Sequence, residues 1–397
     1  MSLEKQIILR SGRDRSVRLR HPWIFASAIE SIQGNPEAGD TLRVISHEGE
    51  ELGTASYSPG SQIRARMWSF DPQEPIDRDF FSRRLRAAID LREEIFSAGQ
   101  TNAFRLVHGE SDGLPGLIVD RYDDTLVAQI LTAGIEAHRA EIFQILMAET
   151  NAKGIYERSD VDVRTLEGLD ERAGLAAGRM PEGPIEITEY GLRFEVDIEN
   201  GQKTGFFLDQ RENRQAILPY VQRASVLNCF SYTGAFSVYA LSGGAEHVLS
   251  IDSSEAALQA VGANLKLNHL DETRSTVMNA DVFKILRTFR DQAKKFDVII
   301  LDPPKFAPTI AQAEKAARGY KDINLLAFKL LNPGGTLLTF SCSGGISREL
   351  FQKIVASAAL DAKVDAKILG YLSQAADHPV SLNFPEGFYL KGLICRV

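Results

Sequence analysis

The pattern of apolar and polar residues changes character near residue 190. Before it, short alternating runs such as "TLRVISHEGEELGTASYS" and "SQIRARMWSF" are separated by turn residues. After it, apolar runs such as "SVLNCF", "HVLSID" and "KKFDVIILDPPK" alternate with amphipathic stretches such as "EAALQAVGANLKLNH". Apolar strands that alternate with helices are typical of a parallel sheet with helices on both faces. The second half of the chain is therefore predicted to be a Rossmann-like α/β domain.

Two composition breaks divide the chain into three segments. "SFDPQEPIDR" and "AGLAAGRMPEGP" are rich in Pro, Gly or alternating charge, which marks linkers. They predict domains over residues 1–72, 73–184 and 185–397: a small all-β barrel, a small α+β domain and the α/β domain. At the C-terminus, "FYLKGLICRV" is expected to pair with "AKILGYLSQ" as an antiparallel strand. Within the α/β domain, Ser253 or Ser254 is expected to cap the helix "EAALQAVGANLKLNH".

The middle segment offers no recognisable chemical cluster. A helix is predicted to begin at Asp79, followed by strands that Gly and Pro interrupt. Asp112 and Asp120 lie in "SDG" and "DRYDD", so we interpret them as turn residues and not as metal ligands.

Composition narrows the class of protein. A chain of 397 residues exceeds the usual size of one hydrophobic core, and 44% hydrophobic with 25% charged residues is ordinary for a soluble protein. No run of eighteen apolar residues occurs, and the first residues lack the apolar region of a signal peptide. Cys229, Cys342 and Cys395 are too far apart to suggest a disulfide framework or a metal site. We expect a cytoplasmic protein with reduced thiols, no membrane association and no metal.

Polar residues follow the predicted parallel strands of the α/β domain. Gly234 comes in a turn after the first strand, where a missing side chain lets backbone approach a ligand. Asp252, Asp281 and Asp302 each follow one of the next three strands. One such acid is often a helix N-cap, but three at one sheet edge indicate a site for an adenosine-bearing ligand. The phosphate-binding glycines and lysine of dinucleotide and nucleotide sites are missing, which favours S-adenosylmethionine over NAD or a nucleoside triphosphate.

Cys342 is predicted to be a nucleophile at the same sheet edge. Cys229 and Cys395 lie inside apolar strands, where buried, inert thiols are common. Cys342 instead ends a strand in "TFSCSGG", a polar turn that a substrate can reach. A thiolate that adds to carbon 6 of a pyrimidine makes carbon 5 nucleophilic enough to take a methyl group. Asp302 is the candidate to stabilise the charged ring, and Lys305 the candidate to lower the pKa of Cys342.

These motifs together resemble a known family. "NGQKTGFFLDQRENR", "NCFSYTGAFS", "DPPKF" and "TFSCS" are similar to motifs of the 23S ribosomal RNA cytosine-5 methyltransferases that carry an N-terminal PUA domain, and the similarity extends to "RHPWIF", "ESDGLPGLIVDRY" and "YERSDVDVR". The resemblance implies a PUA barrel, a small α+β domain and a class I methyltransferase domain. It implies S-adenosylmethionine as cofactor and 23S rRNA, free or in an assembling 50S particle, as partner.

The resemblance also implies roles for individual residues. It makes Cys342 the nucleophile and Asp302 the motif acid, and the implied cofactor-site positions are Phe230, Gly234, Asp252, Asp281 and Asp302. "KTGFFLDQR" is implied to pack near the cofactor through Lys203, Asp209 and Arg211, unless this stretch is only a structural flank. Many RNA cytosine-5 methyltransferases carry a second cysteine where Lys305 stands, so the group that removes the proton from carbon 5 is left open.

RNA capture is assigned to the basic N-terminal segment. The net charge of −8 excludes a uniformly basic surface, but the first twenty-five residues are strongly basic. The candidate phosphate-binding residues are Arg10, Arg13, Arg15, Arg20, His21, Arg64 and Arg66, with Trp23 or Trp68 as candidates for base stacking.

The alternatives left open are a solvated charged face in place of an RNA-binding segment, a methyltransferase that acts on a purine nitrogen, and a non-catalytic RNA-binding or ribosome-assembly module. The oligomeric state is also open, a homodimer included.

Overall fold

The computed structural model describes residues 5–96, 99–306 and 312–397, which form two compact units. Unit 1 comprises Met1–Tyr190, Val196–Leu208 and Ala376–Gly387, and unit 2 comprises Gly191–Glu195, Asp209–Ala375 and Phe388–Val397. Among the described residues, no helix has the length and apolar character needed to cross a membrane. The boundaries of the three-part division drawn from the sequence stay a prediction.

The first part of unit 1 is a six-stranded, mainly antiparallel sheet in the order β2-β6-β5-β4-β1-β3. Only β1 and β4 pair in parallel. Ile7, Leu9, Val44 and Ala65 form part of its buried core. Its elements are β1 (Gln6–Leu9), α1 (Arg15–Arg18), β2 (Trp23–Phe25), η1 (Ala26–Ala28), β3 (Ile29–Gln33), β4 (Thr41–Ile45), β5 (Glu51–Tyr57) and β6 (Ile63–Ser69).

The second part of unit 1 is a five-stranded sheet in the order β11-β10-β9-β8-β7. Helices α2 and α4 contact each other and pack on this sheet. Helix α2 begins where the Asp77 side chain accepts a hydrogen bond from the Phe80 amide, an N-cap, and it buries Phe81 and Leu85. The elements are α2 (Arg78–Ile95), β7 (Ala103–His108), η2 (Gly109–Asp112), β8 (Leu117–Tyr122), β9 (Thr125–Ile130), α3 (Ala133–Ala137), α4 (Arg139–Thr150), β10 (Gly154–Ser159), α5 (Val163–Leu166), β11 (Arg172–Gly178) and β12 (Ile185–Glu189). Strand β13 (Leu192–Val196) belongs to unit 2 except for Val196.

The segment Ala376–Gly387 packs in unit 1 although it comes near the C-terminal end of the chain. The Asp377 carboxylate accepts a hydrogen bond from the Arg105 amide at 2.8 Å. The Phe384 ring lies 4.8 Å from the Trp23 ring, centroid to centroid, and contacts the His21 ring. The segment is thus held by both parts of unit 1.

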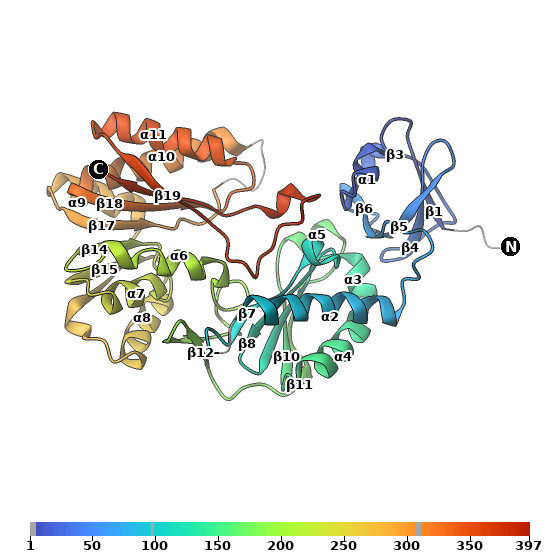
Figure 1. The fold of residues 1–397 in the computed structure, drawn as a ribbon, viewed down its shortest axis with the longest axis horizontal. Helices are drawn as coiled ribbons and strands as arrows, with labels where there is room; N and C mark the ends of the chain where they lie inside the picture. Colours follow the sequence, from blue (N-terminus) through green and yellow to red (C-terminus); the bar gives the residue numbers. More distant parts are fainter. Residues whose placement is uncertain (1–4, 97–98, 307–311) are drawn as a thin grey trace. The chain divides into compact units, whose positions relative to one another are not determined.

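Unit 2 is a seven-stranded sheet in the order β16-β15-β14-β17-β18-β20-β19. The first five strands in this order are parallel, and β20 pairs antiparallel with both β18 and β19. Helices α10 and α11 cover one face and α7 and α8 the other (Figure 1). The elements are η3 (Leu208–Gln210), α6 (Arg211–Gln215), η4 (Leu218–Tyr220), β14 (Ser225–Cys229), α7 (Ala235–Ser242), β15 (His247–Asp252), α8 (Glu255–Leu267), η5 (Glu272–Arg274), β16 (Ser275–Asn279), α9 (Val282–Asp291), β17 (Phe296–Leu301), α10 (Ala313–Leu330), β18 (Leu331–Ser341), α11 (Arg348–Ala362), β19 (Lys367–Ser373) and β20 (Lys391–Arg396). The short helix η7 (Pro385–Gly387) precedes β20 in the chain but belongs to unit 1.

The predicted fold class is confirmed, because a doubly covered parallel sheet follows a mainly antiparallel one. The antiparallel strand expected at the C-terminus is β20, paired with β19 as predicted. Of the two serines proposed to cap α8, Ser254 does so by accepting a hydrogen bond from the Ala257 amide. The carboxyl ends of β14, β15, β16, β17 and β18 lie at one edge of the sheet, where ligands bind in folds of this type.

Candidate functional site

The turn after β14 has an unusual backbone. Phe230, Tyr232 and Gly234 all have positive φ, at 59°, 48° and 78°. For the two aromatic residues this conformation costs on the order of 1–3 kcal/mol each, and such strain gathers at functional sites. A Cβ on Gly234 would lie 2.9 Å from Cγ1 of Val261, a residue of α8. The glycine is thus required by the packing of α8 against this turn, whereas the sequence suggested only the approach of a ligand.

Asp252 joins two loops at this edge. Its carboxylate accepts hydrogen bonds from the Tyr232 amide and the Ser254 amide, each at 2.9 Å. The side chain is half-buried, and a carboxylate has about four acceptor positions, so capacity remains for a ligand hydroxyl. Asp252 therefore sits where the sequence placed it, beside the strained turn after β14.

Asp281 acts as the N-cap of α9. Its side chain accepts a hydrogen bond from the Lys284 amide at 3.2 Å, and the residue is exposed. An acid after a strand is often a helix N-cap, and this role explains the position of Asp281. A cofactor contact by Asp281 stays a prediction.

A row of aromatic rings runs along the strand ends. The ring centroids of Phe230 and Phe283 are 6.3 Å apart, those of Phe283 and Phe306 are 5.7 Å apart, and those of Phe306 and Tyr320 are 4.6 Å apart. Phe230, Phe283 and Phe306 are only partly buried, so the row offers apolar surface to a flat ring. Sequence reasoning missed Phe283, although an aromatic residue two positions after Asp281 at a strand–helix junction is a usable signal.

The two serines beside Cys342 are locked into the protein. Ser341 and Ser343 are fully buried. The Ser343 hydroxyl accepts a hydrogen bond from the Phe306 amide at 3.1 Å and shares another with the Tyr320 hydroxyl at 2.9 Å. Cys342 between them is only half-buried. The polar turn that ends β18 is therefore a rigid support that leaves one thiol accessible.

The other two cysteines are different. Cys229 and Cys395 are buried in β14 and β20. Burial alone raises the pKa of Cys229 well above its usual range and that of Cys395 to about 12. Neither thiol forms a nucleophile near neutral pH, as the sequence suggested.

The turn that carries Cys342 contacts a lysine that sequence reasoning missed. Lys391, the first residue of β20, is 4% exposed, and its ammonium donates a hydrogen bond to the Ser343 carbonyl at 2.7 Å. The pKa of Lys391 is lowered to about 8, chiefly by burial; Cys342 acts in the opposite direction, and Lys305 adds a smaller lowering effect. Lys305 itself is exposed after β17. The candidate cluster thus contains two lysines and the thiol.

The residues of "KTGFFLDQR" fall into both units. Lys203 belongs to unit 1, is exposed, and places its ammonium 4.4 Å from the Phe207 ring centroid. Asp209 and Arg211 belong to unit 2 and are buried, and Asp209 accepts a hydrogen bond from the Tyr389 hydroxyl at 2.7 Å. Cofactor contacts by these three residues stay a prediction.

The basic N-terminal segment is mostly exposed. Arg10, Arg13, Arg15 and Arg20 are exposed, and Arg64 is half-buried with its Nε donating to the Ser61 carbonyl. His21 lies 3.2 Å from a Glu386 carboxylate oxygen.

Arg66 and Trp68 lie in the interior of unit 1. Arg66 is 6% exposed and its guanidinium pairs with Glu167 at 2.9 Å, so a phosphate contact by this side chain is not supported. Trp68 is 2% exposed and its ring contacts those of Phe80 and Phe81. Trp23 is half-buried and donates to Glu110 through its indole nitrogen. The sequence suggested Arg66 as a candidate phosphate-binding residue, but Glu167 and the residues around it bury this side chain.

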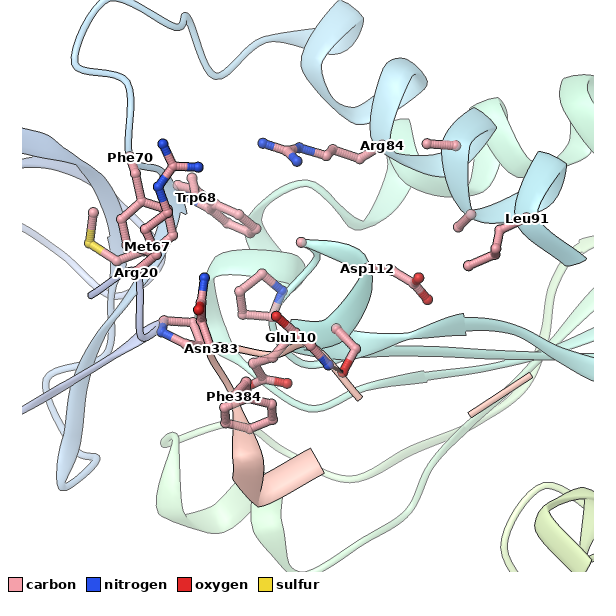
Figure 2. Close-up of a pocket in the computed structure, with 17 residues that line it drawn as sticks. Arg20, Met67, Trp68, Phe70, Arg84, Leu91, Glu110, Asp112, Asn383 and Phe384 are labelled. Carbon is pink, nitrogen blue, oxygen red and sulfur yellow. Dashed lines mark hydrogen bonds between the residues drawn. The ribbon is translucent and has the colours of Figure 1, made fainter. Parts of the chain in front are cut away.

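Unit 1 also contains a cavity of about 390 Å³. Its wall includes Trp68 and Phe70 from the end of β6 and the following turn, Arg84 from α2, and Phe384. Figure 2 shows the side chains of Arg20 and Arg84 on its rim, near Trp68 and Phe70. The lining also includes Glu110 and Asp112, and Arg84 pairs with Glu74 at 3.5 Å, so the cavity combines an apolar wall with charges of both signs.

Comparison with known proteins places this site in a family. Residues 170–365 match the S-adenosylmethionine-dependent methyltransferase domain, and residues 7–70 match the PUA-like domain. The ribosomal RNA large subunit methyltransferase I of Pseudoalteromonas translucida is 52% identical over 98% of this chain and 99% of its own length. The chain belongs to the ribosomal RNA large subunit methyltransferase I family. The protein of the same name from Aeromonas salmonicida is 53% identical over 98% of each chain.

Solved structures of lower sequence identity share the fold. A putative S-adenosylmethionine-dependent methyltransferase from Streptococcus mutans superimposes with a TM-score of 0.85 at 22% identity, covering 99% of this chain and 100% of its own. A putative methyltransferase crystallised with SAH gives a TM-score of 0.86 at 23% identity, with the same coverage. These two structures show the shared fold. The expected cofactor, S-adenosylmethionine, is confirmed by the match of residues 170–365 to the S-adenosylmethionine-dependent methyltransferase domain.

The described residues at the sheet edge fit this cofactor. The half-buried Asp252 carboxylate keeps acceptor capacity for hydroxyl groups, and Phe230 and Phe283 offer apolar surface for a flat ring. The strained turn at Phe230 and Tyr232 brings these two features together. A methyltransferase site of this family is therefore consistent with the residues present.

Proposed function

We propose that this methyltransferase modifies carbon 5 of a cytosine in large-subunit ribosomal RNA through a covalent bond between Cys342 and the base. The observation that supports it is the half-buried Cys342 thiol, held in a rigid turn at the edge of the sheet where the cofactor-binding strands end. A purine nitrogen is already nucleophilic and needs no thiol, whereas carbon 5 of cytosine does.

The proposed reaction begins with the thiolate of Cys342. Its sulfur bonds to carbon 6 of the cytosine, and the electrons of the carbon 5–carbon 6 double bond move into the ring, which makes carbon 5 nucleophilic. Asp302, on the loop after β17, would stabilise the charged ring by a hydrogen bond to N3 or the exocyclic amine. After the methyl group is added, a base removes the proton of carbon 5, the ring regains its double bond and the sulfur leaves carbon 6.

S-Adenosylmethionine supplies the electrophilic methyl group in this reaction. Asp252 would accept hydrogen bonds from its ribose hydroxyls, by the logic of other nucleoside-binding α/β folds. Phe230 and Phe283 would lie against the adenine. Gly234 maintains the packing of the turn that carries Phe230.

Release of the carbon 5 hydrogen tests the proposed position. Ribosomal RNA that carries tritium on carbon 5 of its cytosines is expected to release one tritium for each methyl group transferred by the purified enzyme. Mass spectrometry of the digested RNA should then identify 5-methylcytidine. Methyl transfer without tritium release, with a methylated purine nucleoside as product, would show that the target is a purine. A chain that binds RNA but transfers no methyl group would indicate the non-catalytic assembly role.

RNA capture is proposed for the exposed arginines of unit 1. Arg13 and Arg15 are exposed beside or within α1 and lie in the part of the chain that matches a PUA-like domain. Arg20 and Arg84 lie on the rim of the cavity in unit 1, where a ribonucleotide could place its phosphate on a guanidinium and its base on the apolar wall. These groups would position the RNA without reading its sequence.

Replacing both Arg13 and Arg15 with alanine is expected to weaken RNA binding in a salt-dependent manner. Loss of two phosphate contacts should reduce the slope of log affinity against log salt by about 1.4 for single-stranded RNA. Filter binding or fluorescence anisotropy over a salt series measures this slope, and cofactor affinity should not change. Arg43→Ala is the matched control, because Arg43 is already paired with Glu51 at 2.6 Å. An unchanged slope in the double variant, or an equal change in the control, would remove this segment from the RNA site.

A further inference from the structure

We propose that Lys391 is a positioning residue that holds Cys342 in its reactive thiolate form, a role that rests on the proposed covalent mechanism. Nothing in the order of residues points to it, because Lys391 lies 48 residues after Ser343. The pairing of β18 with β20 brings it to the site.

The register of these two strands places Lys391 beside the nucleophile. Ser341, the last residue of β18, is the antiparallel partner of Lys391, the first residue of β20, and Cys342 is the next residue after Ser341. The Lys391 ammonium reaches the Ser343 carbonyl at 2.7 Å, so it is anchored to the residue on the other side of Cys342. A hydrogen bond to the backbone and strand pairing thus fix the ammonium against the turn that carries Cys342.

Gly392 allows this close packing. A Cβ at Gly392 would lie 2.6 Å from Cδ1 of Phe340, its partner in β18. Any larger residue there would push β20 away from β18 at the point where Lys391 approaches the turn. The glycine therefore supports the position of the lysine.

A buried ammonium requires a compensating partner. Lys391 is 4% exposed, and taking a charge out of water costs several kcal/mol unless it is paired. Among the charged groups that the structure describes as acting on Lys391, only Cys342 favours its charged form. Because such an interaction is mutual, the Lys391 ammonium favours the Cys342 thiolate to the same degree. The position of Lys391 against the Ser343 carbonyl therefore lets it favour the ionised thiol of the neighbouring Cys342.

Three other titratable groups described near the turn of Cys342 are less suited to this role. Tyr320 on α10 shares a hydrogen bond with Ser343, and burial raises the pKa of its phenol, so it is neutral near neutral pH. Lys305, after β17, is exposed and lowers the pKa of Lys391. Asp302 follows the same strand as Lys305 and, as an anion, would oppose the thiolate. The sequence favoured Lys305 as the activating cation, but solvent screens an exposed charge more strongly than a buried one.

The rate of Cys342 alkylation by iodoacetamide as a function of pH tests the proposal without RNA or cofactor. Lys391→Gln can retain a hydrogen bond to the Ser343 carbonyl but removes the charge, and it is expected to slow alkylation at pH 7 about tenfold by raising the pH at which the thiolate forms. Lys391→Arg should restore most of the wild-type profile. Lys305→Gln tests the competing cation and should change the rate less than threefold, roughly, as for an exposed charge. The matched control is Lys367→Gln, an exposed lysine of β19 in the same sheet, which should leave the profile unchanged. Peptide mass spectrometry separates labelling of Cys342 from that of the buried cysteines.

Several outcomes would overturn the role of Lys391. A wild-type profile with its midpoint at or above that of a free thiol, about 8.5, would do so without any variant. A Lys391→Gln profile equal to the wild type, or a Lys305→Gln profile shifted more than that of Lys391→Gln, would do the same. Alkylation involves neither substrate nor methyl transfer. A lowered midpoint of the Cys342 alkylation profile would therefore support the role of Lys391 even if carbon 5 is not the target. Conversely, tritium release would support the proposed reaction even if Lys391 has no part in it.

Discussion

Replacement of Cys342 with serine is expected to lower methyl transfer to ribosomal RNA by roughly 10³-fold or more, as for the loss of other covalent nucleophiles. A serine hydroxyl is not ionised near neutral pH and adds poorly to carbon 6 of a pyrimidine. The surrounding turn should persist, because its hydrogen bonds involve Ser343, Phe306 and Tyr320 and not the thiol. The measurement is methyl incorporation under single-turnover conditions, with cofactor affinity from calorimetry as the check on folding.

A matched variant and a trapping experiment make this result specific. Cys395→Ala removes a buried thiol of the same sheet and should keep methyl transfer within about threefold of the wild type, because that thiol is protonated at neutral pH. RNA with 5-fluorocytosine at the target should remain bonded to the wild-type enzyme in a denaturing gel, since fluorine cannot leave carbon 5 as a proton does. Near-normal turnover by Cys342→Ser would contradict the covalent mechanism and favour a purine target.

Substitution of Arg92 by methionine is expected to destabilise unit 1 by about 3–5 kcal/mol. Arg92 on α2 is fully buried and pairs with both oxygens of Asp112 at 2.8 Å. It also donates hydrogen bonds to the Arg105 carbonyl at 3.0 Å and the Asp377 carbonyl at 3.0 Å. Without the guanidinium, the buried Asp112 carboxylate loses its counter-charge and the segment Ala376–Gly387 loses one of its attachments.

Unfolding in urea, followed by tryptophan fluorescence, measures this loss in unit 1 itself. The sequence contains two tryptophans, Trp23 and Trp68, and both belong to unit 1. The matched control on the same helix is Arg86→Met, whose partner is Glu149 and whose side chain is 54% exposed, so a change below about 1 kcal/mol is expected. An Arg92→Met variant within 1 kcal/mol of the wild type, roughly, would show that the buried pair adds little to stability.

Hydrophobic periodicity was sufficient to predict the sheet edge and most of its polar residues. Asp252 and Cys342 lie where apolar strands end, and the end of an apolar run can be located without knowing what packs on it. The antiparallel pairing of β20 was also predictable, because two apolar runs separated by a long loop end the chain.

Contacts between distant segments were not predictable. Asp112 lies in the predicted turn and accepts a hydrogen bond from the His108 amide, but its buried ion pair with Arg92 was not foreseen. Asp120, also interpreted as a turn residue, lies instead inside β8 and forms a buried ion pair with Arg105. Arg66 was expected to bind phosphate but is buried against Glu167. In each case a local pattern shows which side of an element a residue occupies, but not whether another segment covers that side.

The sequence by itself determined the fold class, the strand ends and the accessible position of Cys342, because each depends on residues adjacent in the chain. Only the tertiary structure decided which charges meet. It placed Lys391 against the turn of Cys342 through strand pairing, and it drew the segment Ala376–Gly387 into unit 1. The physical reason is that secondary structure follows from local spacing, whereas the electrostatics of a buried site depend on which distant groups share the same desolvated space.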